Sequence, residues 1–317
     1  MDKKFGFVIL HYLAYDMTCQ CIDTLLDQFG SYNIFVVVVD NASKNSSGKQ
    51  LRDYYKSQTK VEIVLNSENL GFAKGNNIGL QYLIEKFDPD YTIIMNNDVI
   101  IEQDEFLSKI NDIYLEKAFD ILGPDIYCPI SNTHQNPVSE NSEFDFYSLM
   151  KKMKYLQRLN NYFDFLYPLD KIKGTIMYHC KKLYTHTAKK ELYKDPHEEV
   201  LLHGACYIFS SPFIKKRGYA FNPSTFLYFE EEILYFESVK ESFSMIYSPQ
   251  IVVKHLEDVS TNLAFKTDEI KTKMKVNSQL DSSKVLLDLY KEYARENGIV
   301  GNYKIGEINI ESKNKKK

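Results

Sequence analysis

The chain has 317 residues, 44% of them hydrophobic and 14% aromatic, which is enough for one large domain or for a domain with an appendage. Its 39 Lys and Arg residues against 43 Asp and Glu residues give a formal net charge of −4, so there is no global basic field for nucleic acid. No apolar run approaches the roughly 20 residues of a membrane-spanning helix.

Two further features concern the compartment. The start, Met1 to Lys4, leads directly into an apolar strand pattern rather than into a signal peptide. The five cysteines are an odd number at irregular spacing, and Cys19 with Cys21 lacks the second pair that a zinc site needs. We therefore expect reduced thiols in a cytoplasmic protein, either soluble or attached peripherally to the inner face of the plasma membrane.

The first 125 residues alternate between apolar runs of strand length and segments with apolar residues at helical spacing. Strands are predicted at residues 5–10, 34–39, 61–65, 91–95 and 119–122. Helices are predicted at residues 18–29, 51–55, 72–87 and 106–114. The β-branched run of the second strand is typical of a parallel sheet covered on both faces. The repeated strand–helix units predict βαβ crossovers and a Rossmann-like sheet.

Residues 144–195 have a different composition. They hold 11 Lys and Arg against 5 Asp and Glu, together with 11 Phe and Tyr, and they predict helical pieces at 147–155 and 156–165. One interpretation is a solvated helical insertion that packs on the core. The other is an acceptor-side or membrane-surface element, because basic residues interleaved with aromatic ones suit anionic lipid headgroups.

The remaining chain returns to regular patterns. A strand is predicted at 201–209, a strand end at 252–255, and one or two closing helices at 268–297. The lysine-rich end, 312–317, is expected to be solvated or to add affinity for a membrane surface.

Three motifs in the first half carry chemistry. They are the strand that ends in Asp40 and Asn41, the glycine-rich N-L-G-F-A-K-G-N-N-I-G run from Asn69 to Gly79, and the strand that ends in Asn96, Asn97 and Asp98. A carboxylate at the carboxyl end of an apolar strand is how an open α/β sheet builds a ligand or metal site. Together these motifs resemble the nucleotide-binding half of family-2 glycosyltransferases, inverting enzymes with a GT-A fold.

The resemblance implies a nucleotide site. Asp40 would accept a hydrogen bond from the imide N–H of uracil or thymine, and His11 and Tyr12 would line the same pocket, although His11 alone also fits a satisfied strand-end histidine. Asn76 and Asn77 would reach the ribose or the base edge, with a plain helix N-cap as the alternative. The implied nucleotide-binding set is His11, Tyr12, Asp40, Asn41, Gly71, Asn76, Asn77, Asn96 and Asn97.

A metal site is implied by the place of Asn96, Asn97 and Asp98, which corresponds to the family's Asp-x-Asp-type motif. Asp98 would bind Mg²⁺ or Mn²⁺, cations that take few carboxylates together with diphosphate oxygens and water, and the metal would neutralise the leaving group. The two amides depart from the usual motif, so we expect metal binding to depend on the nucleotide. His255 would complete the metal site or touch the diphosphate, unless it is structural.

The second half resembles the family's Glu-Asp motif at Phe226 to Leu234, where three glutamates follow one another. Adjacent residues on a helix are about 100° apart, so the three cannot all face one cleft. Alignment to the motif makes Glu231 the general base and Glu230 the acceptor-binding neighbour, while Glu232 would face solvent or a basic partner. The alternative is a charged helix start that the macrodipole stabilises.

Small residues before that motif suit a donor sugar close to the backbone. The donor-sugar and acceptor vicinity is expected at His203, Gly204, Ala205 and Cys206. The resemblance as a whole implies a GT-A, mostly parallel α/β sheet flanked by helices. Its expected segments are a nucleotide-sugar half at 1–125, an inserted basic, aromatic acceptor region at 126–200, an acceptor and catalytic half at 201–262, and C-terminal helices with a basic tail at 263–317.

The activity implied is metal-dependent inverting transfer of a hexosyl or rhamnosyl group. The donor would be a UDP- or dTDP-sugar, and the acceptor a saccharide or lipid-linked saccharide of bacterial capsule, O-antigen or cell-wall glycan. The Asn-Asn-Asp form and the Thr133 to Pro137 stretch resemble rhamnosyltransferase-type enzymes. A homodimer and the inner membrane surface are further partners that the sequence leaves open.

Two other functions remain open. A non-catalytic nucleotide-sugar-binding component of a polysaccharide assembly complex would bind nucleotide without turnover. A sugar nucleotidyltransferase would need a basic glycine-rich loop near the start, and residues 10–16 have neither glycine nor lysine.

Overall fold

The computed structural model describes residues 3–139, 146–168, 191–256 and 267–297. The strands are β1 (Phe5–His11), β2 (Ile34–Asp40), β3 (Val61–Leu65), β4 (Tyr91–Asn96), β5 (Val99–Ile100), β6 (Ile121–Cys128), β7 (Thr133–His134), β8 (His197–Glu198), β9 (Cys206–Ser210) and β10 (Met245–His255). The helices are α1 (Tyr15–Phe29), α2 (Ser47–Tyr55), α3 (Gly71–Phe87), α4 (Phe106–Lys117), α5 (Phe146–Asn161), η1 (Leu192–Lys194, 3-10), α7 (Ser211–Arg217), α8 (Glu230–Glu241) and α10 (Asp268–Glu296).

All the strands belong to one sheet, with the order β3-β2-β1-β4-β9-β6-β10-β5 and with β7 and β8 paired to β6 and β10. Strands β3, β2, β1 and β4 are parallel, and so are β6 and β10, whereas β9 is antiparallel to both of its neighbours. The predicted α/β fold with a mostly parallel sheet is therefore confirmed.

The register of the sheet brings the chemical motifs to one edge. His11 is paired with Asp40, and Leu10 with Asn96, because the carboxyl ends of β1, β2 and β4 are level. Strand β9 enters from the opposite direction beside β4, where the backbone N–H of Asn96 donates to the carbonyl of Ala205 at 2.9 Å. The last residue of β10, His255, is paired with Val99 of β5, directly after Asp98.

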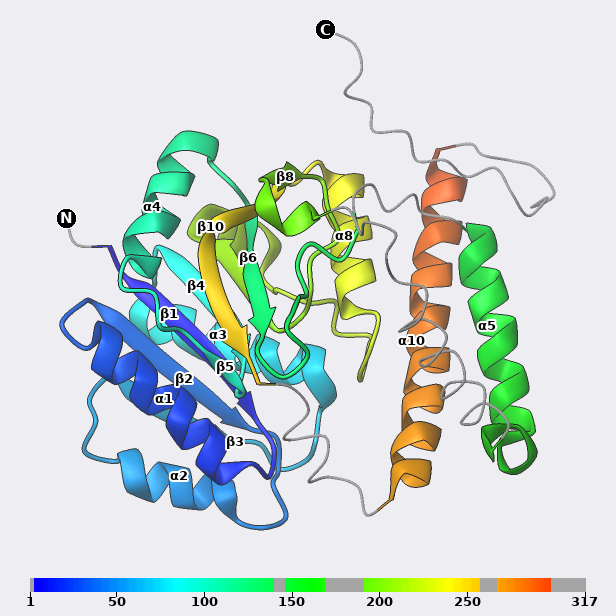
Figure 1. Ribbon diagram of the computed structural model, residues 1–317, viewed down its shortest axis with the longest axis horizontal. Helices are drawn as coiled ribbons and strands as arrows, with labels where there is room; N and C mark the ends of the chain where they lie inside the picture. Colours follow the sequence, from blue (N-terminus) through cyan, green and yellow to red (C-terminus); the bar gives the residue numbers. More distant parts are fainter. Residues whose placement is uncertain (1–2, 140–145, 169–190, 257–266, 298–317) are drawn as a thin grey trace, which may run out of the picture.

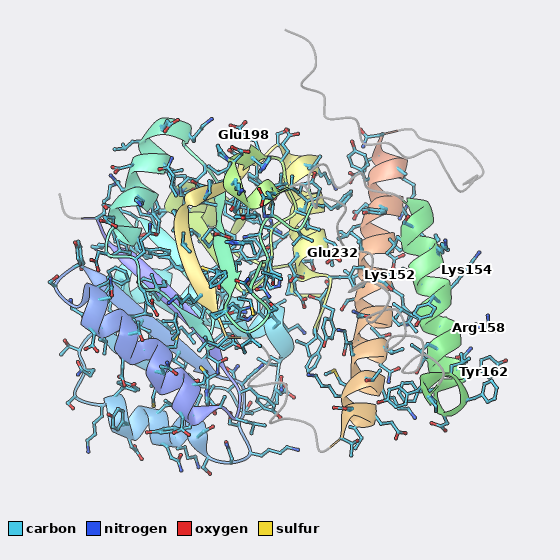
Figure 2. The ribbon with its side chains drawn as sticks, in the orientation of Figure 1. Lys152, Lys154, Arg158, Tyr162, Glu198 and Glu232 are labelled. Carbon is cyan, nitrogen blue, oxygen red and sulfur yellow. The ribbon has the colours of Figure 1, made fainter. Side chains whose placement is uncertain are left out.

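Helices cover both faces of the sheet, and the helix pair α5 and α10 stands beside it (Figure 1). Helix α10 packs on α8, where the rings of Phe236 and Tyr290 have centroids 4.8 Å apart. Figure 2 shows Lys154 and Arg158 on the side of α5 that faces away from the sheet. None of the described helices combines the length and apolar character needed to cross a bilayer.

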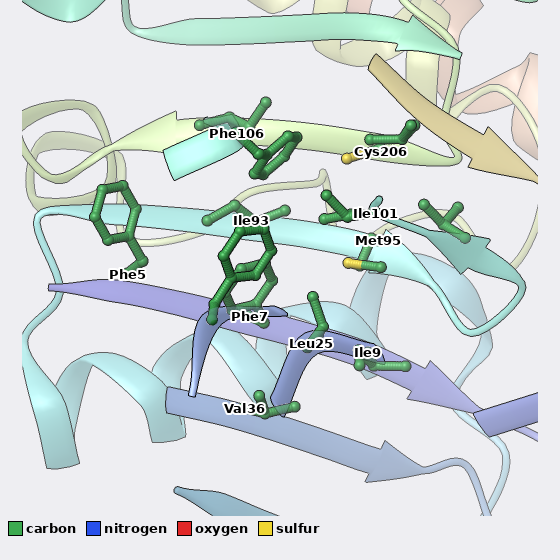
Figure 3. Close-up of a cluster of buried hydrophobic side chains, with 14 of the residues drawn as sticks. Phe5, Phe7, Ile9, Leu25, Val36, Ile93, Met95, Ile101, Phe106 and Cys206 are labelled. Atoms are coloured by element: carbon green, nitrogen blue, oxygen red, sulfur yellow. The ribbon is translucent and has the colours of Figure 1, made fainter. Parts of the chain in front are cut away.

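Two apolar clusters hold the sheet between its helices. Alternate residues of β1 point to opposite faces, so Phe7 and Ile9 belong to the cluster that includes Leu25 of α1 and Phe106 of α4, as Figure 3 shows. Val8 points the other way, into the cluster formed with α3, α7, α8 and α10. Two covered faces explain why the strands read as continuous apolar runs.

Some predicted boundaries differ from those observed. The two predicted helical pieces at 147–165 divide after Asn161 instead of at 155, since α5 is continuous to that residue and helical backbone resumes at 163–168. The strand predicted at 201–209 begins only at Cys206, because residues 202–205 turn into the site. One helix, α10, takes the place of one or two closing helices. The lysine-rich end at 312–317 lies outside the described residues.

Candidate active site

Asp40, at the end of β2, packs closely against the first residues of α2. Both of its carboxylate oxygens accept from the backbone N–H of Ser43, at 3.1 and 3.3 Å. A Cβ at Gly48 would overlap the Asp40 carboxyl, so the absence of a side chain there is what lets α2 begin so close to Asp40. The Asp40 side chain is 9% exposed, which leaves a small opening toward a ligand.

His11 is fully buried behind Asp40 and supports the two neighbouring helices. Its Nδ1 lies 2.7 Å from Thr18 Oγ1 of α1, and its Nε2 lies 2.7 Å from Ser47 Oγ of α2. Burial lowers the pKa of His11 to about 4, against the opposing effect of Asp40, so the ring is neutral. Both ring nitrogens are thus engaged by the protein, while Tyr12, next along the chain, is half-buried.

Asn41 fixes the glycine-rich turn to the sheet. Its amide group donates to Asn69 Oδ1 at 2.9 Å and to the carbonyl of Gly71 at 3.0 Å, and its oxygen accepts from the backbone of Leu70 at 2.9 Å. Gly71 has a φ of 78°, and a Cβ there would overlap the carbonyl of Phe226. The turn therefore contacts the segment that leads to the three glutamates.

The two asparagines of α3 differ in their surroundings. Asn77 is a structural anchor, because it donates to the carbonyl of Phe221 at 2.7 Å and accepts from the backbone N–H of Ala220 at 3.0 Å. Asn76 donates to the carbonyl of Phe72 at 3.0 Å, while its buried Oδ1 has no hydrogen-bond partner among the described residues. Only Asn76 thus has an acceptor left for a ligand.

Asp98 and His255 face one another at the carboxyl ends of β4 and β10. His255 Nδ1 lies 2.8 Å from Gln135 Oε1, an acceptor, so Nδ1 carries a proton and Nε2 is the ring nitrogen that faces Asp98. The distance from Nε2 to Asp98 Oδ1, a buried oxygen without a hydrogen bond from the described residues, is 3.3 Å. A proton or a cation between these two atoms would satisfy both of them.

These two groups fit a divalent cation. A histidine that donates its other ring nitrogen to an acceptor is the usual arrangement of a metal ligand. Within the described residues no cluster of three or more His, Cys, Asp or Glu side chains is placed to hold a metal. Mg²⁺ and Mn²⁺ sites of few protein ligands are completed by substrate phosphates and water, so the pair suits a cation that arrives with a diphosphate.

The other two asparagines of this motif are placed differently. Asn96 is half-buried and held by its backbone to β9, and Asn97 donates from its amide to Thr18 Oγ1 at 2.9 Å. Thr18 also contacts His11. The Asn97 side chain therefore ties the Asp98 turn to the start of α1.

His203 lies beside this pair. Its Nδ1 accepts from the backbone N–H of Ala205 at 3.1 Å, so Nε2 carries the proton, and its ring centroid is 5.8 Å from that of His255. Burial, and secondarily His255, lower the pKa of His203 to about 4, so it is a neutral donor. Cys206, two residues beyond Gly204, points into the apolar core instead, where burial raises the pKa of its thiol.

The three glutamates begin α8 after two residues of left-handed backbone, Tyr228 and Phe229, with φ of 70° and 69°. Glu230 is 4% exposed, and its Oε1 has no hydrogen-bond partner among the described residues. Burial, with Glu231 as a second cause, raises the pKa of Glu230 to about 8.

Glu231 is half-buried beside Gly204. Desolvation and then the charge of Glu232 raise the pKa of Glu231 to about 7, while the backbone N–H of Gly204 and the charge of Lys152 oppose that rise. Glu232 points elsewhere and lies 4.0 Å from Lys152 Nζ of α5. Of the two surroundings expected for Glu232, solvent or a basic partner, the structure shows the basic partner.

Gly204 permits the contact with Glu231, because a Cβ there would overlap the Glu231 carboxylate. Gly204→Ala is expected to push this carboxylate away and to cost turnover without loss of donor affinity. A displacement of about 1 Å is enough for a 10²-fold loss. Steady-state kinetics, with a thermal melt of each variant, would check this. The control is Gly218→Ala. Nothing lies within 4 Å of a Cβ at Gly218, so this change adds only the backbone strain of an alanine at a φ of 80°.

Sequence reasoning left several supporting residues without a role. Gln135 orients His255, and Asn136 accepts from the backbone N–H of His203 at 2.8 Å. Both belong to the Thr133 to Pro137 stretch, which the sequence marked only as family-like. Gly48 and the contact of Lys152 with Glu232 had no signal, because their importance depends on which chain segments meet in space.

Comparisons with known proteins identify the family of the chain and its fold. The family model described as Glycosyl transferase family 2 matches residues 7–187. The dTDP-rhamnosyl transferase RfbF of Shigella flexneri is 28% identical over 135 residues, which are 40% of this chain and 44% of that protein. The low-salt glycan biosynthesis hexosyltransferase Agl10 of Haloferax volcanii is 22% identical over 240 residues, 69% of this chain and 64% of that one. The matches thus span less than two thirds of each relative.

Two solved structures are similar in fold. The crystal structure of S. aureus TarS 1-349 has a TM-score of 0.51 and 13% identity, and the match covers 95% of this chain and 76% of that one. GalNAc-T7 with UDP, GalNAc and Mn²⁺ has a TM-score of 0.53 and 12% identity, with 81% and 44% covered. At such identities the likeness concerns the fold, and the predicted GT-A-like fold is confirmed.

Proposed function

The chain belongs to glycosyl transferase family 2, and from that premise we propose that it is an inverting nucleotide-sugar glycosyltransferase. Its donor would be a UDP- or dTDP-sugar and its acceptor a saccharide or lipid-linked saccharide. In this proposal residues 1–125 bind the donor, 126–200 and 201–262 serve the acceptor and catalysis, and 263–317 are a C-terminal part that includes α10.

One observation carries the proposal. Three consecutive residues, His203 to Ala205, connect the two candidate centres: the ring of His203 is 5.8 Å from that of His255, Gly204 touches Glu231, and the Ala205 carbonyl accepts from the backbone of Asn96. These three residues therefore link Glu231, a carboxylate with a pKa of about 7, to Asp98 and His255, the pair suited to a cation. Glycosyl transfer needs both, a base for the acceptor hydroxyl and a counter-charge for the diphosphate.

Each side chain then has a defined task. Glu231 takes the proton of the acceptor hydroxyl as that oxygen bonds to the anomeric carbon and the bond from this carbon to the diphosphate breaks. His203 donates from Nε2 to a donor oxygen, and Glu230 positions the acceptor. Asp98 and His255 would hold the divalent cation, Mn²⁺ or Mg²⁺, which supplies positive charge to the diphosphate when bound. Asp40 accepts from the base, and Asn76 Oδ1 accepts from the ribose.

The relatives guide the choice of sugar. One matched protein is a dTDP-rhamnosyl transferase and the other a hexosyltransferase of glycan biosynthesis. We therefore propose transfer of a rhamnosyl or hexosyl group during assembly of a bacterial surface polysaccharide. A thermal-shift screen of UDP-, dTDP- and GDP-sugars with and without Mn²⁺ tests the donor, because a ligand of the folded state raises the unfolding temperature by mass action.

Asp40→Ala is expected to remove most of the thermal shift caused by UDP or dTDP while leaving its metal dependence unchanged. The loss of a hydrogen bond between a charged carboxylate and the base corresponds to about 1.5–3 kcal/mol, or about 10- to 100-fold in Kd. Asp53→Ala, an exposed carboxylate of α2, is the control. Equal nucleotide affinity in Asp40→Ala and wild type would remove Asp40 from the site.

A further inference from the structure

Helix α5 has one buried face and one exposed face. Leu156, Leu159 and the following Phe163 form a small apolar cluster with Val276 and Leu280 of α10. These contacts fix the rotation of α5 about its axis, so the residues on the opposite side point outward.

The outward face, which we call the α5 face, consists of residues within a 100° arc of a 3.6-residue helix. Its members are Lys151, Lys154, Tyr155, Arg158 and Tyr162. Figure 2 shows Lys154, Arg158 and Tyr162 pointing away from the body of the molecule. Tyr162 is 62% exposed, and Phe165 just beyond it is 72% exposed. At 1.5 Å per residue the face is about 16 Å long.

The positive charge of this face has no acidic neighbour on α5 itself. Helix α5, with the sequence FYSLMKKMKYLQRLNN, has basic residues at four positions and no acidic residue. Some exposed lysines of other segments lie against carboxylates, as in Lys284 with Asp281 at 2.7 Å and Lys117 with Glu198 at 2.9 Å. In the part of the chain that the structure describes, no carboxylate pairs with Lys151, Lys154 or Arg158. The α5 face of this protein, whose net charge is −4, thus carries unpaired basic side chains together with exposed aromatic rings.

We propose that the α5 face binds the surface of a bilayer that contains anionic lipids. Basic side chains interspersed with Tyr and Phe suit both parts of a membrane interface. The basic groups contact the lipid phosphates, and the aromatic rings enter the headgroup region. An acidic protein partner would match the charges but would leave the rings without a complementary layer. The helix lies along the surface with α10 behind it.

The binding face is connected to the glutamates of α8. Lys152, on the inner edge of α5, has its Nζ 4.1 Å from the ring centroid of Phe229 and 4.0 Å from Glu232 Oε1. A helix with its side chains is about 10–12 Å across, so the start of α8 lies about one helix diameter from the bound surface. This consequence alone rests on the proposed function, since it brings Glu231 within reach of an acceptor carried by a lipid.

The test is partitioning into phosphatidylcholine vesicles with and without phosphatidylglycerol. Wild type should bind only the anionic vesicles and should lose binding as salt is raised. The triple change of Lys151, Lys154 and Arg158 to Gln should weaken partitioning about 100-fold, at about fivefold for each basic group. Lys152 is left intact, because it contacts the α8 start.

Helix α2 and the residue after it supply matched controls. Lys49 and Arg52 of α2 and the following Lys56 have the same spacing and are exposed, so the same triple change to Gln should leave partitioning unaltered. Tyr162→Ser should weaken binding, whereas Tyr54→Ser, equally exposed at 62%, should not. Thermal melts confirm that each variant is folded.

Three outcomes would overturn the proposal: no partitioning of wild type into anionic vesicles, an equal loss in the α2 variant, or equal binding to neutral vesicles. A change from dimer to monomer in the α5 triple variant, without vesicle binding by wild type, would mean that a second copy covers this face. The thermal shift with UDP or dTDP is measured in parallel, so that failure of the donor site is separable from failure of the membrane face.

Discussion

Glu231→Gln is expected to lower turnover by about 10²–10⁴-fold, the usual contribution of a general base, with donor affinity unchanged. The substitution keeps the shape of the side chain and its contact with Gly204, but it removes the proton acceptor. Turnover from initial rates and donor affinity from calorimetry decide the result. A loss of only a few-fold would mean that the carboxylate is simply part of a charged helix start.

The two neighbouring glutamates are the internal controls. Glu232→Gln should change turnover by only a few-fold, because Glu232 faces Lys152 of α5. Glu230→Gln should have an intermediate effect, through the position of the acceptor. If Glu232→Gln were the inactive variant, the motif would be shifted by one residue.

The pH dependence gives an independent readout of the same group. Glu231 must be ionised to accept a proton, and its pKa is raised to about 7, so the rate should rise with pH and level off above that value. Glu232→Gln removes a like charge, so the rise of the rate should occur at lower pH. Lys152→Met removes an opposing positive charge and should move it to higher pH. Shifts of the same sign in both variants would contradict Glu231 as the titrating group.

The alternation of apolar strands and amphipathic helices predicted the first half of the fold well. Residues such as Val36 and Ile93 lie on strands that helices cover on both faces. Such strands are continuous apolar runs in the sequence, so their burial could be predicted locally. The place of β9 between β4 and β6 had no such signal, because it depends on pairing between segments more than 80 residues apart.

The candidate site was predictable where side chains act at strand ends and less so where they support one another. Asp98 and His255 are far apart in sequence, and only the family resemblance linked one to the other, yet they face each other at 3.3 Å. Asn77 belongs to the glycine-rich motif and was predicted to bind the nucleotide, but its amide group is hydrogen-bonded to Ala220 and Phe221. The sequence shows which residue types are present, while the direction of a side chain depends on the segments that pack against it.

The second large effect is expected at Asp98. Asp98→Asn keeps the size of the side chain but replaces a charged oxygen ligand with an amide, which a hard divalent cation prefers less. We expect metal-dependent turnover to fall by about 10²–10³-fold, since the cation contributes several kcal/mol of charge stabilisation in such a site. Binding of Mn²⁺ in the presence of UDP or dTDP, followed by electron paramagnetic resonance, should be lost in parallel, whereas nucleotide binding without metal should persist.

Asp125→Asn is a matched control for this change. Asp125 is also a buried carboxylate, 5% exposed against 6% for Asp98, and it too has a histidine partner, with His134 Nδ1 2.9 Å from its oxygen. A cost that comes only from breaking a buried His–Asp contact should appear in both variants as a lower melting temperature. Loss of Mn²⁺ binding should appear in Asp98→Asn and in His255→Ala but not in Asp125→Asn. Retained Mn²⁺ affinity in Asp98→Asn would remove Asp98 from the metal site and would mean that another group neutralises the diphosphate.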